Sequence, residues 1–351
     1  MGVKIGDVEI YMGPKEVGAP DDLRKVIVDF IDGAKKKLDI AVQELDSMEI
    51  AKAIIRARQR SVTVRLVLEG DYLTVDKAVP DPFQPIGTNE INRQIHDAVL
   101  RTKINVKSDF NPKIFHQKFI IRDGSALLTG STNFTDTGTS SNLNHVVIVR
   151  SRKVANIYTK EFKEIMQGHF GKLDEGHDPT PDDVEVSDIP IRILFAPDHA
   201  PEMEIMKQML KAKKNIDFAI FTFAQSSGID DTMIALRRAG IKIRGAMDGK
   251  QANQKWAATR PLKQKGVELY LVQEGGKVRK LHHKLMVIDN QAVIAGSFNY
   301  TAPANQFNDE NIIILGDLDS KNAASIAKQK KIASYASEEI DRIIEKHGKK
   351  F

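Results

Sequence analysis

Two stretches of the chain carry the same chemically active residue types at the same spacing. The first, HQKFIIRDGSALLTGSTN, runs from His116 to Asn133, and the second, HHKLMVIDNQAVIAGSFN, runs from His282 to Asn299. Counted from the histidine, both have Lys at +2, Asp at +7, Gly at +14, Ser at +15 and Asn at +17. These pairs are Lys118 and Lys284, Asp123 and Asp289, Gly130 and Gly296, Ser131 and Ser297, and Asn133 and Asn299. Matching types at fixed offsets indicate an internal duplication.

Each stretch reads as a β-hairpin that presents polar residues together. Residues two apart in a strand point to one face, so His116 lies with Lys118 and His282 with Lys284. The Asp-Gly at 123 and the Asp-Asn at 289 are typical of hairpin turns. The serine and asparagine of the return strand share a face, and the glycine before the serine is predicted to let a ligand approach the backbone. Each half thereby offers an imidazole, an ammonium, a hydroxyl and an amide.

This set of groups suits a phosphate, with the imidazole as nucleophile or proton donor. Displacing an alcohol from a phosphodiester needs an attacking group on one side of phosphorus and an acid on the other. Two halves that meet at their motifs supply both. One histidine attacks and forms a phosphohistidine, while the other protonates the leaving oxygen and later activates water. Lys118, Lys284, Asn133 and Asn299 are expected to hold the phosphate oxygens.

Structural interpretations of the same residues compete with the catalytic one. A metal site or buried structural histidines are the alternatives for the His/Lys pairs, but a lysine two residues from each histidine disfavours a dication. Asp123 and Asp289 have the opposite strand parity and are expected to support the turns. The motif serines, Ser131 and Ser297, either support the loop or belong to the site. Two further histidines, His145 and His283, are expected to be structural.

The elements around the motifs also occur twice. Residues 35–71 and 213–250 each read as a short apolar strand, an amphipathic helix and a second strand, which is a βαβ unit. A further amphipathic helix precedes each unit, at residues 23–31 and 203–210. We therefore predict an α/β protein of two tandem, pseudo-symmetric domains, 1–172 and 191–351. The acidic, proline-containing segment 173–190 is the expected linker.

Composition narrows the class of protein. The chain of 351 residues has a formal net charge of +5, a pI near 9.0 and 41% hydrophobic residues, which favours a globular protein with an anionic partner. Because there is no cysteine, disulfides, thiolate metal sites and a cysteine nucleophile are excluded. No apolar stretch reaches the length of a membrane span, so we expect a cytoplasmic protein without stable membrane attachment.

The doubled His-x-Lys-x4-Asp, each followed by Gly-Ser-x-Asn, resembles the pattern of the phospholipase D superfamily. Both copies are complete, and the repeat around them covers nearly the whole chain. The resemblance implies phosphodiester chemistry, a mixed β-sheet flanked by helices in each half and an active site at the interface between the halves. It also implies no required metal, and we expect no cofactor. Because both motifs lie in one chain, a monomer suffices for a complete site.

One position differs between the halves. The superfamily usually carries a carboxylate at +28 that orients the catalytic histidine; here the second half has Glu310, but the first has Asn144. A carboxylate favours the imidazolium and an amide does not, so we expect His282 to hold a proton more readily than His116. On this reasoning His116 is the nucleophile and His282 the general acid and base.

Three segments are candidates for substrate contact. The proline-rich insertion after Asp71, around Phe83, is expected to be a loop over the cleft. Residues 250–265 surround the single tryptophan with basic residues, which suits a nucleic-acid backbone with stacked bases; a solvated helix face with the tryptophan packed inward is the alternative. A basic turn precedes the second motif. The candidate residues are Lys250, Lys255, Trp256, Arg260, Lys277, Arg279 and Lys280.

Three functions fit these patterns. We favour a metal-independent nuclease that cleaves DNA or RNA, because the chain is basic and compact and has no membrane attachment; endonuclease and exonuclease action are both open. The main rival is a phospholipase D or phosphatidyltransferase, which needs an exposed apolar surface such as the insertion near Phe83. A degenerate protein that only binds nucleic acid is disfavoured because neither motif has lost its histidine or lysine.

Overall fold

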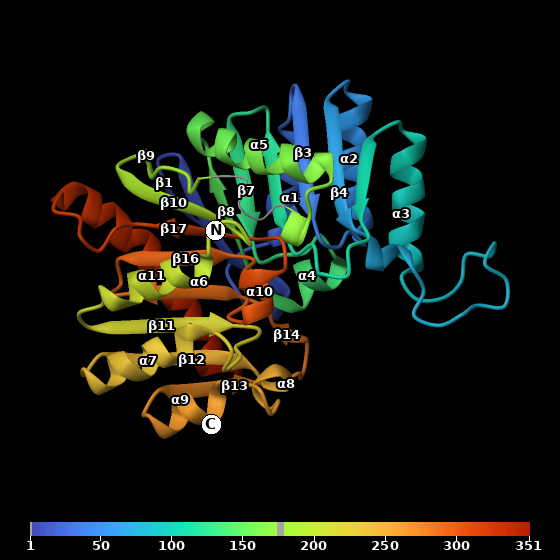
Figure 1. Ribbon diagram of the computed structural model, residues 1–351. Helices are drawn as coiled ribbons and strands as arrows, with labels where there is room; N and C mark the ends of the chain where they lie inside the picture. The colour runs from blue at the N-terminus through green and yellow to red at the C-terminus, as the bar shows by residue number, and fades with distance from the viewer. Residues whose placement is uncertain (1, 174–178) are drawn as a thin grey trace.

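The computed structural model describes residues 2–173 and 179–351. It consists of two halves with the same order of elements, each built around one β-sheet (Figure 1). The first sheet has the strand order β1-β2-β8-β7-β6-β3-β4-β5, with β14 of the second half added beside β8. The second has the order β18-β13-β12-β11-β15-β16-β17-β10-β9. The predicted α/β fold of two tandem domains is confirmed.

The first half contains strands β1 to β8 and helices α1 to α5. Its strands are β1 (Val3–Ile5), β2 (Val8–Gly13), β3 (Lys37–Val42), β4 (Thr63–Glu69), β5 (Asn105–Asp109), β6 (Lys118–Arg122), β7 (Ala126–Gly130) and β8 (Asn142–Val149). Its helices are α1 (Leu23–Asp32), α2 (Met48–Gln59), α3 (Glu90–Arg101), α4 (Asp136–Ser140) and α5 (Arg152–Gln167), with the 3-10 turns η1 (Lys15–Val17), η2 (Gly70–Leu73) and η3 (Gly171–Leu173). Strands β3 and β4, which α2 connects, pair in parallel, whereas β6 pairs antiparallel to β3, so the sheet is mixed.

The second half repeats this order of elements with strands β9 to β18 and helices α6 to α11. Its strands are β9 (Val184–Val186), β10 (Ile189–Ala196), β11 (Asn215–Ile220), β12 (Lys242–Asp248), β13 (Glu268–Val272), β14 (Lys280–Leu281), β15 (Lys284–Ile288), β16 (Ala292–Gly296), β17 (Glu310–Leu315) and β18 (Gly348–Lys350). Its helices are α6 (Pro201–Leu210), α7 (Gly228–Arg238), α8 (Gly249–Ala252), α9 (Thr259–Gln264), α10 (Ala302–Gln306) and α11 (Ala323–His347). Strand β9 and the first residues of β10 lie within the expected linker 173–190, of which residues 174–178 are outside the described residues.

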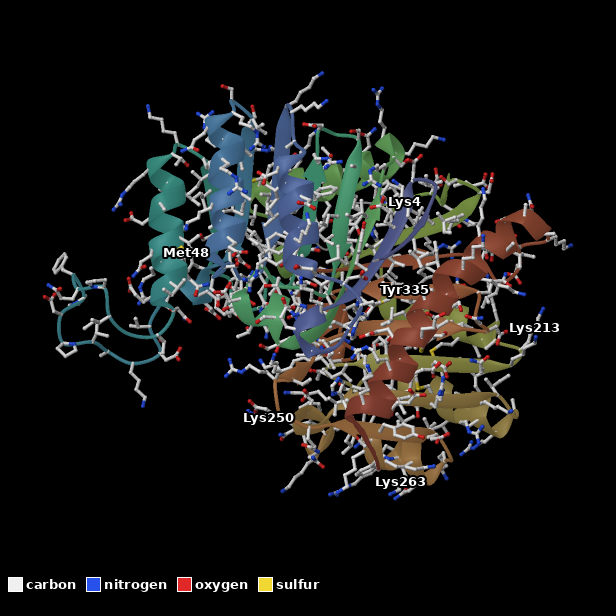
Figure 2. All side chains as sticks on the ribbon, turned by 180° about the vertical axis from the view of Figure 1, so that it is seen from behind. Lys4, Met48, Lys213, Lys250, Lys263 and Tyr335 are labelled. Carbon is white, nitrogen blue, oxygen red and sulfur yellow. The ribbon has the colours of Figure 1, made fainter. Side chains whose placement is uncertain are left out.

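The two halves share one central core. Apolar residues of α1, α2 and α3 pack on the outer face of the first sheet, and those of α6, α7 and α9 on the outer face of the second. Between the sheets, α5 and α11 contribute Tyr158, Phe162 and Ile340 to a single apolar cluster that includes strands of both halves. Helix α11 carries Tyr335, whose hydroxyl donates to Asp21 of the first half at 2.5 Å (Figure 2). Since burying this apolar surface drives folding, the core also fixes the relative position of the two motifs.

The two motifs fold as the expected hairpins, β6–β7 and β15–β16. The two central turn residues have positive φ in both, at 54° and 61° in the first and at 53° and 50° in the second, as a type I′ turn requires. The Asp123 carboxylate accepts from the backbone N–H groups of residues 35–37, and that of Asp289 from residues 213–215. Each aspartate therefore ties its turn to the start of the neighbouring strand.

The motif glycines allow two strands to approach closely. A Cβ on Gly130, where φ is 153°, would lie 2.3 Å from the carbonyl oxygen of His145. A Cβ on Gly296, where φ is 139°, would lie 2.3 Å from that of Asn311. The space that glycine leaves is therefore filled by the adjacent strand, and not by a ligand as the sequence pattern suggested.

Candidate active site

Backbone pairing between the halves brings the motif histidines together. Just before β6, Phe115 pairs in parallel with Asp309, and the N–H of His116 donates to the carbonyl of Asp309 at 3.0 Å. In the same way β14 pairs in parallel with β8, and the N–H of His282 donates to the carbonyl of Leu143 at 2.9 Å. Each histidine consequently lies beside the +28 residue of the opposite half.

The ring of His116 is held by Glu310. Its Nδ1 lies 2.6 Å from Oε2 of that carboxyl, which also accepts from Oγ of Ser297 at 2.5 Å. Both partners are buried, the carboxyl completely. Burial raises the pKa of Glu310 to about 8, while burial and the ammonium groups of Lys118 and Lys284 lower the pKa of His116 well below its usual range. The pair therefore shares a proton between Nδ1 and Oε2, which leaves Nε2 of His116 with a lone pair.

The ring of His282 is held by an amide instead. Its Nδ1 lies 3.0 Å from Oδ1 of Asn144, and Nδ2 of that residue donates to the backbone carbonyls of Gly138 and Asn142. These two bonds identify Oδ1 as the acceptor, so Nδ1 of His282 carries the proton. Oγ of Ser131 donates to the same Oδ1 at 2.8 Å. The motif serines are thus fully buried supports of the +28 side chains.

The crossed contacts correct the expected pairing of the +28 residues. We assigned Glu310 to His282 and Asn144 to His116, because each pair belongs to one half of the sequence. The structure reverses both assignments, because Asn144 lies in β8, which pairs with β14 of the other half, and Glu310 follows Asp309, which pairs with Phe115 of the other half. The prediction that the carboxylate lets His282 hold a proton more readily is therefore wrong. The carboxylate supports positive charge on His116.

The motif lysines point into the same buried space. Nζ of Lys118 donates to Oε1 of Gln43 at 3.1 Å, and Nζ of Lys284 lies 3.2 Å from Nε2 of His282. Each also donates to the backbone carbonyl of its motif histidine. Burial lowers the pKa of Lys118 to about 7 and that of Lys284 well below its usual range. An anion between the two lysines would restore their ordinary pKa, which is the behaviour of a preformed phosphate site.

Two side chains that contact the motif residues, Gln43 and Phe221, were not identified from the sequence patterns. Oε1 of Gln43 accepts from Nζ of Lys118 and from Nδ2 of Asn133 at 3.2 Å. At the equivalent place after β11, the ring of Phe221 lies 4.9 Å from that of His282, between centroids. Both residues directly follow the first strand of a βαβ unit. An alignment of the repeats, AVQEL with AIFTF, marks this position, but no single residue type identifies it.

The remaining motif asparagine has a backbone contact. Oδ1 of Asn299 accepts from the N–H of Thr222 at 3.3 Å. Its amide group therefore keeps two N–H donors for a ligand, whereas Nδ2 of Asn133 keeps one beyond its bond to Gln43. The two imidazoles and the two lysines lie close enough for their charges to act on one another, and Asn133 is linked to Lys118 through Gln43.

Beneath the catalytic layer lies a second layer of crossed polar contacts. Nδ1 of His145 lies 3.1 Å from Nδ1 of His283, whose Nε2 lies 3.4 Å from Glu339 of α11. Nε2 of His145 accepts from the N–H of Gly296 at 3.1 Å, so in the neutral ring Nδ1 carries the proton and donates to His283. These buried histidines join the halves through contacts with each other, with Gly296 and with Glu339, which is consistent with the structural role that we expected.

The corresponding layer on the other side uses amides. Nδ2 of Asn311 donates to Oε1 of Gln117 at 2.7 Å, and Nε2 of Gln117 donates to Glu161 of α5 at 3.2 Å. Glu161 also belongs to the one group of carboxylates, among the described residues, close enough to share a metal ion; the others are Glu164 and Asp198. None of these three carboxylates belongs to a motif.

The predicted substrate residues separate into two sets. Lys250, Arg279 and Lys280 line a cavity of about 470 Å³ that also includes Phe221, next to His282. The others do not line this cavity: Lys255, Trp256, Arg260 and Lys277. Trp256 is 44% exposed, so it is not packed inward. Helices long and apolar enough to cross a bilayer do not occur in residues 2–173 and 179–351.

Comparison with known proteins identifies the family. A family model described as "Cardiolipin synthase, PLD-like domain" matches residues 27–166 and 205–343. The mitochondrial cardiolipin hydrolase of Xenopus laevis is 26% identical over 135 residues, which is 38% of this chain and 57% of that protein. The phospholipase D of Rickettsia conorii is 31% identical over 138 residues, 38% of this chain and 64% of that protein. The chain thus spans little more than half the length of these relatives.

A solved structure supports the fold over the whole length. The phosphatidylserine synthase of Haemophilus influenzae matches with a TM-score of 0.68 and 12% identity, over 100% of this chain and 89% of that one. The relatives also correct our prediction of nucleic acid as the partner. They are a cardiolipin hydrolase and a phospholipase D, so their substrates are phospholipids, and this contradicts the nucleic-acid assignment.

Proposed function

Because the chain belongs to the phospholipase D superfamily, we propose that it is a phosphodiesterase that acts on phospholipids, as a phospholipase D or a phosphatidyltransferase. The observation that carries the proposal is the pair of buried histidines, each with an Nδ1 partner from the opposite half and a buried lysine beside it. The lipid class rests on the named relatives and on an exposed apolar loop near the site.

In the proposed first step, Nε2 of His116 attacks phosphorus. The bond from phosphorus to the headgroup oxygen breaks, and a phosphohistidine forms. Positive charge develops on the imidazole during the attack, and Glu310, 2.6 Å from Nδ1, offsets it. His116 thus remains the nucleophile, although the reason is the reverse of the one that the sequence suggested.

His282 serves as the acid and then as the base. Burial and the nearby lysines lower the pKa of His282, and Asn144, which accepts from its Nδ1, offers no negative charge that would raise it. Once Nε2 has bound a proton, the ring therefore gives that proton readily to the leaving oxygen. The neutral ring then takes a proton from water, which attacks phosphorus and frees His116. An alcohol in place of water gives phosphatidyl transfer by the same step.

The segment between η2 and α3 supplies an apolar surface of the kind that a lipid interface requires. Residues 74–89 project from the body of the protein in both views (Figures 1 and 2). The side chain of Phe83 is 96% exposed, and Ile86 is also exposed. At the root of the loop, the Tyr72 hydroxyl accepts from Nε2 of Gln43, which in turn contacts Lys118. An exposed aromatic linked to the site suits insertion among lipid headgroups.

The test is release of phosphatidic acid from vesicles of phosphatidylethanolamine, phosphatidylglycerol or cardiolipin in excess EDTA. Wild type and the His96→Ala variant, altered in the outer helix α3, should cleave at least one lipid, whereas His116→Ala and His282→Ala should lose at least a hundredfold in kcat.

Vesicle flotation tests whether the loop binds lipid. Phe83→Ser should reduce binding to vesicles more than Leu210→Ser, which removes an exposed apolar side chain from the other half. Unchanged cleavage by both motif variants, or no product from any lipid, would overturn the proposal.

A further inference from the structure

The two halves of the site differ at one position beside the motif histidines. Gln43 and Phe221 occupy equivalent places, because the backbone N–H of each donates at 2.9 Å to the carbonyl of the residue after a motif histidine. These acceptors are Gln117 and His283. The side chain at this position is an amide in the first half and an aromatic ring in the second. The site is therefore polar at this position on the His116 side and apolar on the His282 side.

The ring of Phe221 lies against the reactive groups of the second half. Its centroid is 4.9 Å from that of His282, and the two ring planes are tilted by 52°. Nζ of Lys284 lies 5.1 Å from the same centroid, and Nζ of Lys280 lies 5.7 Å from it. The imidazole that serves as the base in the proposed reaction is thus covered on one side by a hydrocarbon surface.

The amide of Gln43 has a different effect on the first half. Its Oε1 accepts from Nζ of Lys118 and from Nδ2 of Asn133, and its Nε2 donates to the hydroxyl of Tyr72. A water molecule beside this amide can exchange hydrogen bonds with it, whereas the ring of Phe221 offers no comparable donor or acceptor. Water is therefore solvated less well on the His282 side of the site.

Phe221 also lines a cavity of about 470 Å³. The cavity lies between the halves, because Asn142 of β8 lines it together with Lys250 and Lys280 of the second half. Since the ring of Phe221 also contacts His282, the cavity gives room close to the base for a molecule larger than water.

The second step of the proposed reaction takes place on this side of phosphorus. An O–H group attacks opposite Nε2 of His116, so it approaches from the side of His282. The new oxygen–phosphorus bond forms, the phosphorus–nitrogen bond breaks with its electron pair returning to His116, and the proton passes to Nε2 of His282. Water and an alcohol undergo the same step. They differ in the carbon chain, which packs on an aromatic ring, whereas water beside that ring leaves hydrogen bonds unmade.

We propose that Phe221 is a specificity-determining residue that favours an alcohol over water as the acceptor of the phosphatidyl group. The inference rests on the proposed function and concerns its second step alone. The proteins that resemble this chain include a hydrolase and a synthase, so their names leave the acceptor open.

The experiment measures how the phosphohistidine divides between the two acceptors. Vesicles of a phospholipid that wild type cleaves are incubated at a fixed ethanol concentration, and the ratio of phosphatidylethanol to phosphatidic acid is measured. Phe221→Gln places the side chain of the equivalent position beside His282, and it should lower this ratio about tenfold because water gains a hydrogen bond. Phe221→Ala should lower the ratio as well, since it opens space for water next to the base.

Two control variants separate polarity from other effects. Phe221→Leu keeps an apolar side chain and should stay within about twofold of the wild-type ratio. Trp256→Gln makes the same kind of change at an exposed aromatic residue that does not line the cavity, and it should leave the ratio unchanged. Because the division occurs after the phosphohistidine has formed, slower formation in a variant does not alter the ratio.

The outcomes distinguish this inference from the proposed function. The same ratio in wild type, Phe221→Gln and Phe221→Ala would overturn the role of Phe221, as would a wild type that forms phosphatidic acid alone, and the proposed function would stand in both cases. An equal fall in Phe221→Leu and Phe221→Gln would show that the apolar character of the side chain does not select the acceptor. If wild type releases no headgroup from any lipid, the proposed function itself fails.

Discussion

The crossed contact between His116 and Glu310 leads to the sharpest prediction. In Glu310→Gln the side chain keeps its size but loses its charge, so the 2.6 Å contact to Nδ1 no longer offsets the charge of the attacking ring. A hydrogen bond to a charged group is worth about 1.5–3 kcal/mol, which corresponds to a loss of roughly 10- to 150-fold in rate. Because the carboxyl is fully buried, solvent does not compensate, and we expect a loss near the upper end.

The assay must distinguish the two histidines that Glu310 could serve. A phosphodiester with a p-nitrophenol leaving group needs no acid, because the phenolate leaves without a proton. Glu310→Gln should therefore remain slow in single turnovers on this ester as well as on a phospholipid. The Asn144→Ala variant, altered at the partner of His282, should be slow on the phospholipid and recover most of its rate on the ester. Thermal unfolding of both variants controls for loss of the fold.

The opposite result would refute the reasoning. If Glu310→Gln recovers on the p-nitrophenyl ester and Asn144→Ala does not, the carboxylate acts through the acid, as the linear sequence suggested. A phosphohistidine trapped on His282 and not on His116 would also assign the carboxylate to the acid. Either finding would mean that the crossed contacts do not operate in the reaction.

Three further predictions concern charge and packing. Asn144→Asp places a carboxylate at Nδ1 of His282, which raises the pKa of that ring, so the limb of the kcat/KM profile that reports the acid should move to higher pH by about one unit or more. The pKa of Lys118 is about 7 in the folded protein and about 10.5 in the unfolded chain, so the unfolded chain binds more protons between these pH values. The unfolding free energy of wild type should therefore rise relative to that of Lys118→Met by about 2–3 kcal/mol between about pH 6.5 and pH 9. The same pH dependence of the unfolding free energy in both proteins, measured with urea, would contradict this. Gly130→Ala should cost roughly 1–3 kcal/mol in urea unfolding, because its Cβ meets the carbonyl of His145, whereas Gly240→Ala, with the same sign of φ but open space around it, should cost less.

The net charge of the chain led us to favour nucleic acid as the substrate. A net charge of +5 favours anionic partners, but phospholipids are anionic as well as nucleic acids, so charge alone does not separate them. The feature that favours a lipid, the exposed Phe83 loop, was visible in the sequence only as an insertion of uncertain exposure. Solvent exposure of an apolar residue depends on what packs over it, and this requires the fold.

The sequence by itself determined the chemistry and most of the architecture. The repeated offsets specified hairpins, their turns and the pairing of each histidine with its lysine, because strand and turn geometry act over a few residues. The βαβ order and the two-half fold follow from apolar periodicity, which is equally local. The role of Asp123 and Asp289 in the turns was also predictable, because their odd spacing from the motif histidines places them on the other face of the strand.

Only the tertiary structure decided which half serves which histidine. Glu310 lies 28 residues from His282 in sequence but contacts His116, because Asp309, just before β17, pairs with Phe115, just before β6. Gln43 and Phe221 enter the site for a similar reason, since the ends of β3 and β11 lie beside the motif strands. Such contacts join residues far apart along the chain, and their free energy depends on the packing of both halves on one core. No local pattern encodes them.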